Sequence, residues 1–352
     1  MMGAMAMMGA VAMMGAVAVV DNAPVRAVLG RAVALLCVAV LSVSAASCTT
    51  DIPDRVTFIA DRCERVIGPS DANALQIGAI LSLMRFGASP DLDDVANSLA
   101  LELAVNQVND RQGVKGRRFR LTICDKAGDS VDDGEETAAE MARWLVEQGN
   151  ASIIAGGSAD TLAIHAATRT SGTLIVARTA TSADITHLDD GLVWRTAPSD
   201  LYQGLVLARL LEQQKASKVA IIAISNSYGD SLAKIVLDNA PDAMEVQTYA
   251  VTEGGKNLPA VIAAAEAQAP DFLLLITAID DAKTILEAKN APALAKARLL
   301  LADSLHSVDL VNAVSDKSRL VGALGTLPGD PFGKVYKTLQ NSFLLAYGAD
   351  ST

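Results

Sequence analysis

The sequence predicts an α/β protein of two similar lobes, each a parallel sheet flanked by helices, with a hinge between them. The first observation is that short runs of consecutive apolar residues alternate with stretches in which apolar residues recur at helical spacing. Strands that are apolar throughout are typical of parallel sheets covered by helices on both faces. The second observation is that the alternation restarts after Pro198, which indicates a second lobe.

Lobe 1 is predicted to span residues 74–197. Apolar residues at 101, 104, 105 and 108 fall on one helical face, residues 138–145 repeat this spacing, and Gly149 is placed to end that second helix. A third helix is expected to run to about Ser171. Four strands are expected, at 75–81, 118–124, 152–155 and 174–177.

Lobe 2 is predicted to span residues 198–326. Its expected helices lie at about 200–216, from Gly229, at 259–268 and at 280–290. Its expected strands lie at 219–224, 246–251, 272–276 and 298–301. The final segment, 327–352, is expected to return to lobe 1.

Residues 1–24 form a low-complexity segment of Met, Gly and Ala, of which 1–18 are three near-copies of one hexapeptide, MMGAMA, MMGAVA and MMGAVA. Some 20 uncharged residues are long enough to span a bilayer, so a transmembrane helix is one interpretation. The other is translated upstream sequence, with the start codon assigned too early, because a complete export signal follows directly.

That export signal is predicted over residues 25–47. Arg26 and Arg31 form a basic region, 32–43 an apolar region, and small residues lead to Cys48. This pattern resembles a bacterial lipoprotein signal, in which the cysteine is lipidated and anchors the mature chain to the membrane. The three residues before Cys48, Ala-Ala-Ser, lack the usual Leu at the third position back, so cleavage without lipidation is the alternative. Either interpretation places the protein outside the cytoplasm, in the periplasm or cell envelope.

Residues 48–73 are polar and mixed, and are predicted to be a tether with at most one short element. Cys63 lies in it and Cys124 ends the second strand. Two cysteines in an oxidising compartment predict a disulfide, and two buried free thiols are the alternative. No Cys or His pair has the spacing of metal ligands, so we expect no metal site, and His165, His187 and His306 are scattered.

Composition and motifs exclude several functions. The formal net charge is −11 and the pI about 4.8, which argues against a nucleic-acid partner. Only 4% of residues are aromatic, which argues against a stacking platform for sugars or bases. The sequence has no G-x-S-x-G, G-x-G-x-x-G, P-loop or H-E-x-x-H motif, so we expect neither an enzyme nor a cofactor.

Two polar loops follow adjacent strands of lobe 1, where open α/β sheets bind their ligands. After the third strand come Gly156, Gly157 and Ser158; the glycines permit close backbone approach, and the first amides of the next helix would face an anionic group. After the fourth strand, residues 178–182 (RTATS) are rich in short donors and acceptors. Helix capping alone is the structural alternative for a Ser or Thr at such a place.

Residues 74–347 resemble the type I periplasmic binding proteins, in particular the branched-chain amino-acid receptors of ABC transporters. The resemblance is carried by five pieces in the family's order: LALELAVNQVNDRQGVKGRRFRLTICD, SIIAGGSADT, GTLIVARTATSADIT, LVWRTAPSDLYQG and KVAIIAISNSYGDSLA. It implies the type I periplasmic binding fold, a small-molecule ligand and a membrane permease as partner.

The resemblance also implies site residues. Ser158 matches the serine that binds a ligand carboxylate, and Ala180 and Thr181 match its partners in the next loop. Tyr228 matches the tyrosine of lobe 2 that closes over the ligand. Asp303 falls at or next to the acidic position that pairs with an α-ammonium group, with a helix N-cap as the alternative.

The sequence departs from the family in three places. The first loop has Arg85 where a Leu-Thr-Gly run is usual, and Arg85 would either pair with a ligand carboxylate or face solvent. The loop Thr277–Asp280 lacks the aromatic side chain of many amino-acid binders. Family members continue for several elements beyond the resemblance to NSFLLAYGADST, so we expect the chain to be truncated at its C-terminus.

The function implied is a solute-binding protein that captures a small polar ligand, an amino acid or a related carboxylate or amide, for an ABC transporter. Capture would occur by closure about hinges near 195–198 and 326–328. The alternatives are a ligand-sensing lipoprotein of a signalling system and, less favoured by the motifs, an exported hydrolase.

Overall fold

The structure is a computed structural model that describes residues 59–85, 89–126, 134–188, 190–327, 329 and 333–348. Val56–Thr352 forms one compact unit. The low-complexity segment, the export signal and Cys48 lie outside the described residues.

The described part of lobe 1 contains a six-stranded sheet with the strand order β1-β5-β2-β6-β7-β8. Neighbouring strands are parallel, except that β1 pairs with β5 in the antiparallel direction. The strands are β1 (Arg65–Ile67), β2 (Leu75–Leu81), β5 (Phe119–Asp125), β6 (Ser152–Ala155), β7 (Leu174–Ala177) and β8 (Val193–Arg195). A short hairpin of β3 (Met84–Arg85) and β4 (Ser89–Pro90) follows β2.

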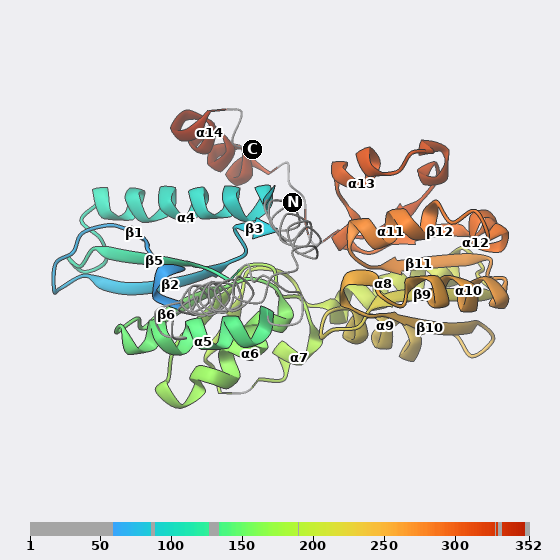
Figure 1. The fold of residues 1–352 in the computed structure, drawn as a ribbon, viewed down its shortest axis with the longest axis horizontal. Helices are drawn as coiled ribbons and strands as arrows, with labels where there is room; N and C mark the ends of the chain where they lie inside the picture. The colour runs from blue at the N-terminus through green and yellow to red at the C-terminus, as the bar shows by residue number, and fades with distance from the viewer. Residues whose placement is uncertain are drawn as a thin grey trace, which may run out of the picture. The chain divides into compact units, whose positions relative to one another are not determined.

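Helices cover both faces of this sheet: α4 lies on one face, and α5 and α6 lie on the other (Figure 1). In the middle of β2, a Cβ added to Gly78 would lie 2.6 Å from a methyl carbon of Leu145, so the glycine lets α5 pack close to the strand. Near the C-terminus, α14 packs against α4. The helices are α4 (Leu92–Asp110), α5 (Gly134–Glu147), α6 (Ser158–Thr168), α7 (Ala183–Thr186) and α14 (Lys334–Tyr347), with a 3₁₀ helix at Arg169–Ser171.

Lobe 2 contains a parallel sheet with the order β10-β9-β11-β12-β13 in the described residues. All residues of β11 are buried, as expected for a central strand of a parallel sheet. The strands are β9 (Lys218–Ile224), β10 (Glu245–Val251), β11 (Phe272–Ile276), β12 (Arg298–Leu301) and β13 (Leu324–Gly325).

One face of this sheet packs against α8 and α9, and the other against α10, α11 and α13. The helices are α8 (Asp200–Gln213), α9 (Gly229–Asp238), α10 (Leu258–Gln268), α11 (Ile279–Leu286), α12 (Pro292–Lys296) and α13 (Val308–Ala313). Three 3₁₀ helices lie at Glu253–Gly255, Asp303–Leu305 and Lys317–Leu320. The predicted fold class, with helices on both faces of two largely parallel sheets, is confirmed.

The segment predicted as a tether contains a short element, as the prediction allowed, and its second half packs against lobe 1. Residues 65–67 form β1, a strand of the sheet of lobe 1, and Ile67 is buried. Ile59 and Cys63 are buried as well, so the segment contributes to the core. A strand of three residues is too short to show a periodic pattern, so the sequence did not reveal the type or position of this element.

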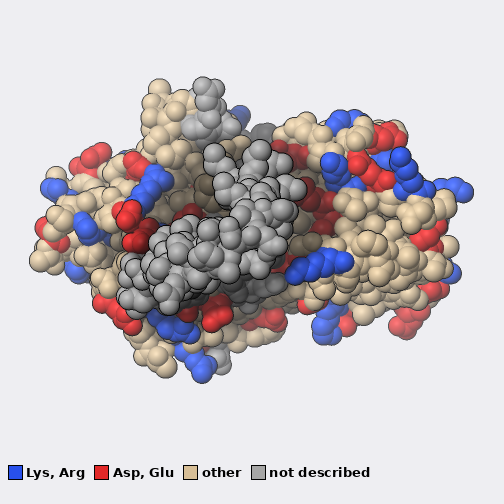
Figure 2. Space-filling model, viewed as in Figure 1, with Lys and Arg blue, Asp and Glu red and all other residues tan. Residues whose placement is uncertain are grey.

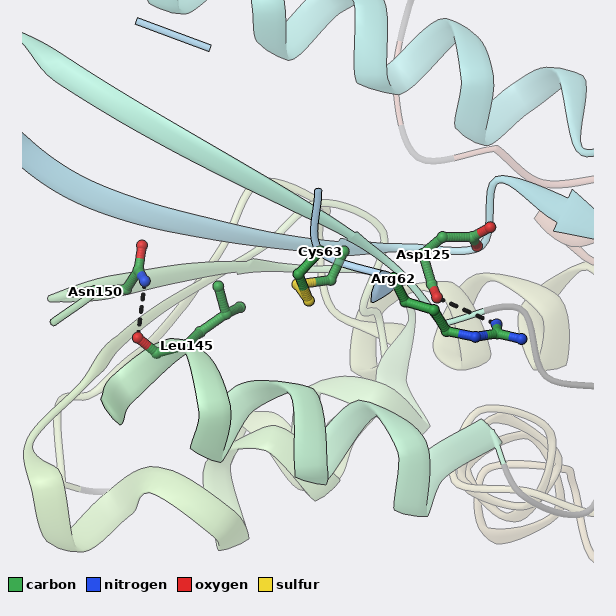
Figure 3. The surroundings of a disulfide bond; sticks show 6 residues. Arg62, Cys63, Asp125, Leu145 and Asn150 are labelled. Carbon is green, nitrogen blue, oxygen red and sulfur yellow. Dashed lines mark hydrogen bonds between the residues drawn. A yellow bond between two sulfur atoms is a disulfide. The ribbon is translucent and has the colours of Figure 1, made fainter. Parts of the chain in front are cut away.

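A disulfide joins Cys63 to Cys124, which are 61 residues apart, so the disulfide prediction is confirmed over the free-thiol alternative. Figure 3 shows the bridge beside β5, with the side chain of Arg62 reaching the carbonyl of Asp125 at 3.4 Å. The amide of Asp125 in turn donates to the carbonyl of Arg62 at 2.9 Å. The bridge and these hydrogen bonds attach the segment before β1 to the sheet.

Candidate functional site

The carboxyl ends of the strands of lobe 1 form a topological switch point. From β2 the chain passes through α4 to β5 on one side, whereas from the neighbouring strand β6 it passes through α6 to β7 on the other side. The connections that leave β2 and β6 therefore run in opposite directions, and open α/β sheets bind ligands in the crevice that results. The loops after β6 and β7 both lie at this edge.

Ser158 joins these two loops. Its hydroxyl oxygen accepts hydrogen bonds from the amides of Thr181, at 3.1 Å, and Ser182, at 3.0 Å. Ser158, Ala180, Thr181 and Ser182 are all buried. A serine hydroxyl that accepts two bonds keeps its own proton for donation. The structure therefore brings together the three residues predicted in lobe 1 and leaves Ser158 able to donate to an acceptor.

The start of α8 is hydrogen-bonded to the loop after β7. The amide of Asp200 donates to the carbonyl of Thr181 at 2.8 Å. The guanidinium of Arg195 donates to the carbonyls of Thr181, at 3.2 Å, and Ser182, at 2.8 Å, and to the hydroxyl of Thr186. Burial lowers the pKa of this guanidinium below its ordinary value. Arg195 thus holds the loop after β7 in place.

Asp200 is the residue that sequence reasoning missed. Its side chain is 0% exposed, and neither carboxylate oxygen has a hydrogen-bond partner in the part of the chain that the structure describes. Burial, and secondarily the charge of Asp303, raise the pKa of its carboxyl from 3.8 to about 7, although the neighbouring Thr181 hydroxyl and Arg195 lower it in part. A buried carboxylate whose charge is only partly stabilised is costly, so Asp200 has the capacity to bind a cationic group. In the sequence, an Asp after Ser199 has the pattern of an ordinary first-turn residue, and this concealed its role.

Asp303 and Tyr228 form the part of the site in lobe 2. One carboxylate oxygen of Asp303 accepts from the hydroxyl of Tyr228 and from the side-chain amide of Gln203, both at 2.8 Å. The N-cap alternative for Asp303 is wrong, because Ala302 caps the 3₁₀ helix and no side chain bonds to its first amides. Burial and the charge of Asp303 raise the pKa of Tyr228 well above its ordinary value, which keeps the phenol protonated as a donor.

Local geometry explains the position of Tyr228. The side chain of Asn226 accepts from the amides of Tyr228, at 3.1 Å, and Gly229, at 3.0 Å. A Cβ on Gly229 would lie 2.0 Å from the carbonyl oxygen of Ile224, so only glycine fits there. Tyr228 and Gly229 therefore start α9 in close contact with the last residue of β9, Ile224.

Hydrogen bonds and charge interactions connect the residues of the two lobes. The amide of Asp200 at the start of α8 is bonded to Thr181, and the charge of Asp303 in lobe 2 raises the pKa of the Asp200 carboxyl. The amide of Ala183 in α7 also donates to the hydroxyl of Ser231 in α9 at 3.2 Å. The cluster thus combines the hydroxyls of Ser158, Thr181 and Tyr228 with two carboxylates, Asp200 and Asp303, and Arg195 donates to the backbone of the same loop.

A cavity of about 590 Å³ opens beside this cluster, at the same strand ends. Gly157 and Thr179, the residues before Ser158 and Ala180, line it. Arg85 lies in β3, but its side chain lies outside what the structure describes, so its predicted contact with a ligand carboxylate stays a prediction.

Three further observations bear on other functions. No group of three or more His, Cys, Asp and Glu residues within the described ranges is arranged to hold a metal ion, and His165 lies 2.5 Å from Asp190. No described helix is both long and apolar enough to cross a membrane. Lys and Arg are interspersed with Asp and Glu on the face shown in Figure 2, without the basic stripe of a nucleic-acid interface.

Comparison with known proteins decides the family. The sequence profile of the family described as periplasmic binding protein matches residues 87–310, well over half of the chain. The chain belongs to the periplasmic binding protein family, with the type I fold. Named members of this type I periplasmic binding protein family are similar to it in sequence. The Leu/Ile/Val-binding protein of Escherichia coli K12 is 26% identical over 231 residues, which are 64% of this chain and 61% of the relative. The chain thus spans about three fifths of that relative's length.

Solved structures share the fold at lower sequence identity. A leucine-binding protein from Thermotoga maritima has a TM-score of 0.64 and 19% identity, over 78% of this chain and 77% of that one. A fatty acid ABC transporter substrate-binding protein from Thermomonospora curvata has a TM-score of 0.66 and 17% identity, over 82% and 73%. The same fold therefore serves ligands as different as leucine and fatty acids, so the ligand must be argued from the site.

Proposed function

We propose that this periplasmic binding protein is an extracytoplasmic solute-binding protein that captures an amino-acid-like ligand by its carboxylate and its ammonium group. The observation that carries the proposal is the buried Asp200 carboxylate: neither of its oxygens meets the geometry of a hydrogen bond from a described donor, the Thr181 hydroxyl and Arg195 stabilise its charge only in part, and the charge of Asp303 raises the pKa of the carboxyl. A cation placed there would relieve the cost of burying this charge and the repulsion between the two carboxylates.

The other end of the ligand has matching donors. Ser158 keeps a proton to donate, and Thr181 lies against it at the carboxyl ends of β6 and β7. Two hydroxyl groups can bind a carboxylate without a positive side chain, because hydrogen bonds to a charged acceptor are stronger than those between neutral groups. Tyr228 is held by Asp303 and would close over the ligand from lobe 2.

Transport is the context that the relatives support. The relative from Escherichia coli is named as a Leu/Ile/Val-binding protein, and the structural neighbours include a substrate-binding protein of an ABC transporter. We infer that the closed, ligand-bound form docks on a membrane permease, and that the chain acts outside the cytoplasm. Lipidation of Cys48 remains part of this proposal.

Calorimetry on the full chain tests the proposal. A panel of α-amino acids is compared with 2-hydroxy acids that carry the same side chains and lack the ammonium group. We expect at least one amino acid to bind, and its 2-hydroxy counterpart to bind about 100-fold or more weakly, because a buried charge would lose its partner. Equal affinity for the two, or binding of none, would refute the proposal.

A further inference from the structure

Gln203, in the first turn of α8, holds Asp303 by a hydrogen bond. Its side-chain nitrogen Nε2 donates to Oδ1 of Asp303 at 2.8 Å, and the hydroxyl of Tyr228 donates to the same oxygen at 2.8 Å. Asp303 lies 100 residues further along the chain, just after β12. The carboxylate that the proposed function assigns to the ligand's ammonium group is therefore held by two uncharged donors.

The amide of Gln203 makes a second hydrogen bond. Nε2 also donates to the hydroxyl oxygen of Thr326 at 3.1 Å, and the backbone amide of Thr326 donates to the carbonyl of Leu301 at 3.2 Å. A primary amide nitrogen carries two hydrogens, and a carboxylate oxygen only accepts, so the two bonds form together with the nitrogen towards Asp303. Thr326 directly follows β13, where the chain leaves lobe 2 for α14, which packs on α4. Gln203 is thus fixed at two points.

The two donors to Asp303 converge on one of its oxygens. In the part of the chain that the structure describes, Oδ1 accepts both hydrogen bonds and Oδ2 accepts none. Each carboxylate oxygen has two lone pairs, so Oδ1 is satisfied while Oδ2 keeps its full capacity. A cationic group of a ligand can therefore bind Oδ2 without displacing either donor.

Gln203 stabilises the Asp303 carboxylate without neutralising it. Asp200 precedes Gln203 by three residues in α8, and residues at this spacing share one face of a helix. The charges of Asp200 and Asp303 oppose each other, since the charge of Asp303 raises the pKa of the Asp200 carboxyl. A lysine or arginine at position 203 would cancel one of these charges, whereas an amide leaves both for a cation of the ligand.

We propose that Gln203 is a positioning residue, which fixes the Asp303 carboxylate so that Oδ2 is presented to the ligand's ammonium group. This inference rests on the proposed function, since it takes the contact between Asp303 and the ammonium group as given. A side chain that is already ordered loses less entropy when a ligand binds. Gln203 therefore contributes to affinity through Asp303, without a contact of its own to the ligand.

The first test is calorimetry on the full chain with the substitution Gln203→Met. Methionine has a similar length and helix propensity and no N–H, so it removes both hydrogen bonds with little change in packing. The common α-amino acids are titrated, and the one that the native protein binds most tightly is compared with its 2-hydroxy counterpart. We expect the amino acid to bind about 3- to 10-fold more weakly to the variant, and the 2-hydroxy acid to change by less than about twofold.

The matched control is Gln213→Met, because Gln213 is an exposed glutamine at the end of the same helix. We expect this control to bind both ligands with native affinity. Equal losses for the two ligands in Gln203→Met would show a structural role alone and would overturn the inference. Native affinity for both, with cooperative thermal unfolding, would overturn it too. If the native protein itself does not prefer the amino acid, the proposed function fails as well.

The second test is Gln203→Lys, which places an ammonium group within reach of Asp303. An ion pair with Asp303 would replace the lost hydrogen bond and compete with the ligand's ammonium group. We expect the amino acid to lose about tenfold or more in affinity and its advantage over the 2-hydroxy acid to shrink accordingly. Gln213→Lys makes the same change of charge at an exposed position and should leave the preference native. An undiminished preference in Gln203→Lys would overturn the inference and leave the proposed function standing.

Discussion

The substitution Asp200→Asn probes the buried carboxylate directly. The pKa of this carboxyl is about 7 in the folded protein and 3.8 when unperturbed, so the folded state binds the proton more tightly than the unfolded state. The contribution of this carboxyl to the free energy of unfolding therefore falls as pH rises from about 4 to about 7, and is level above that. The whole difference corresponds to about 4 kcal/mol at 1.36 kcal/mol per pH unit.

Asparagine has the same shape and no charge, so the variant should lose this dependence on pH. We expect it to unfold with a free energy about 2–4 kcal/mol higher than the native protein at pH 8, and nearly the same at pH 4. Urea unfolding followed by circular dichroism at pH 4, 6 and 8 measures the difference. A difference between variant and native protein that does not change with pH would refute the reasoning about Asp200.

Three further predictions concern the framework of the site. Replacing both Cys63 and Cys124 by serine should lower the free energy of unfolding by about 2–4 kcal/mol, since the bridge closes a loop of 61 residues, and an unchanged urea midpoint would contradict this. Gly229→Ala places a Cβ against the carbonyl of Ile224 and should cost about 1–3 kcal/mol in the same assay, with loss of ligand affinity; full stability would show that the turn is free to move. Ser158→Ala leaves two buried amides without an acceptor and should cost about 1–3 kcal/mol and weaken ligand binding, whereas native-like values of both would remove Ser158 from the site.

The strands and their covering helices could be predicted because strands of a buried parallel sheet are runs of consecutive apolar residues in the sequence. The segments 152–155 and 272–276 are apolar at nearly every position, and β6 and β11 occupy those residues. An element of few residues is too short for such a run to be recognised, as with the three residues of β1.

The candidate site was predictable only in part. Ser158 and Thr181 were found because they follow adjacent strands, and strand order places such loops together. Asp200 was missed because its burial comes from distant parts of the chain. Likewise, the cavity is lined by two ion pairs, Lys126 with Asp160 and Arg178 with Asp94, whose members are 34 and 84 residues apart in the sequence. Nothing in a local pattern reveals such pairs.

The central claim is that the ligand's ammonium group binds to the carboxylates of Asp200 and Asp303. Calorimetry at pH 7, in two buffers with different ionisation enthalpies, tests it most directly. With a carboxyl pKa of about 7, roughly half of the Asp200 side chains carry a proton that a bound cation would displace. We predict a buffer-dependent heat that corresponds to release of about half a proton per ligand, and none in the Asp200→Asn variant. Equal heats in both buffers for a ligand that binds would contradict the account.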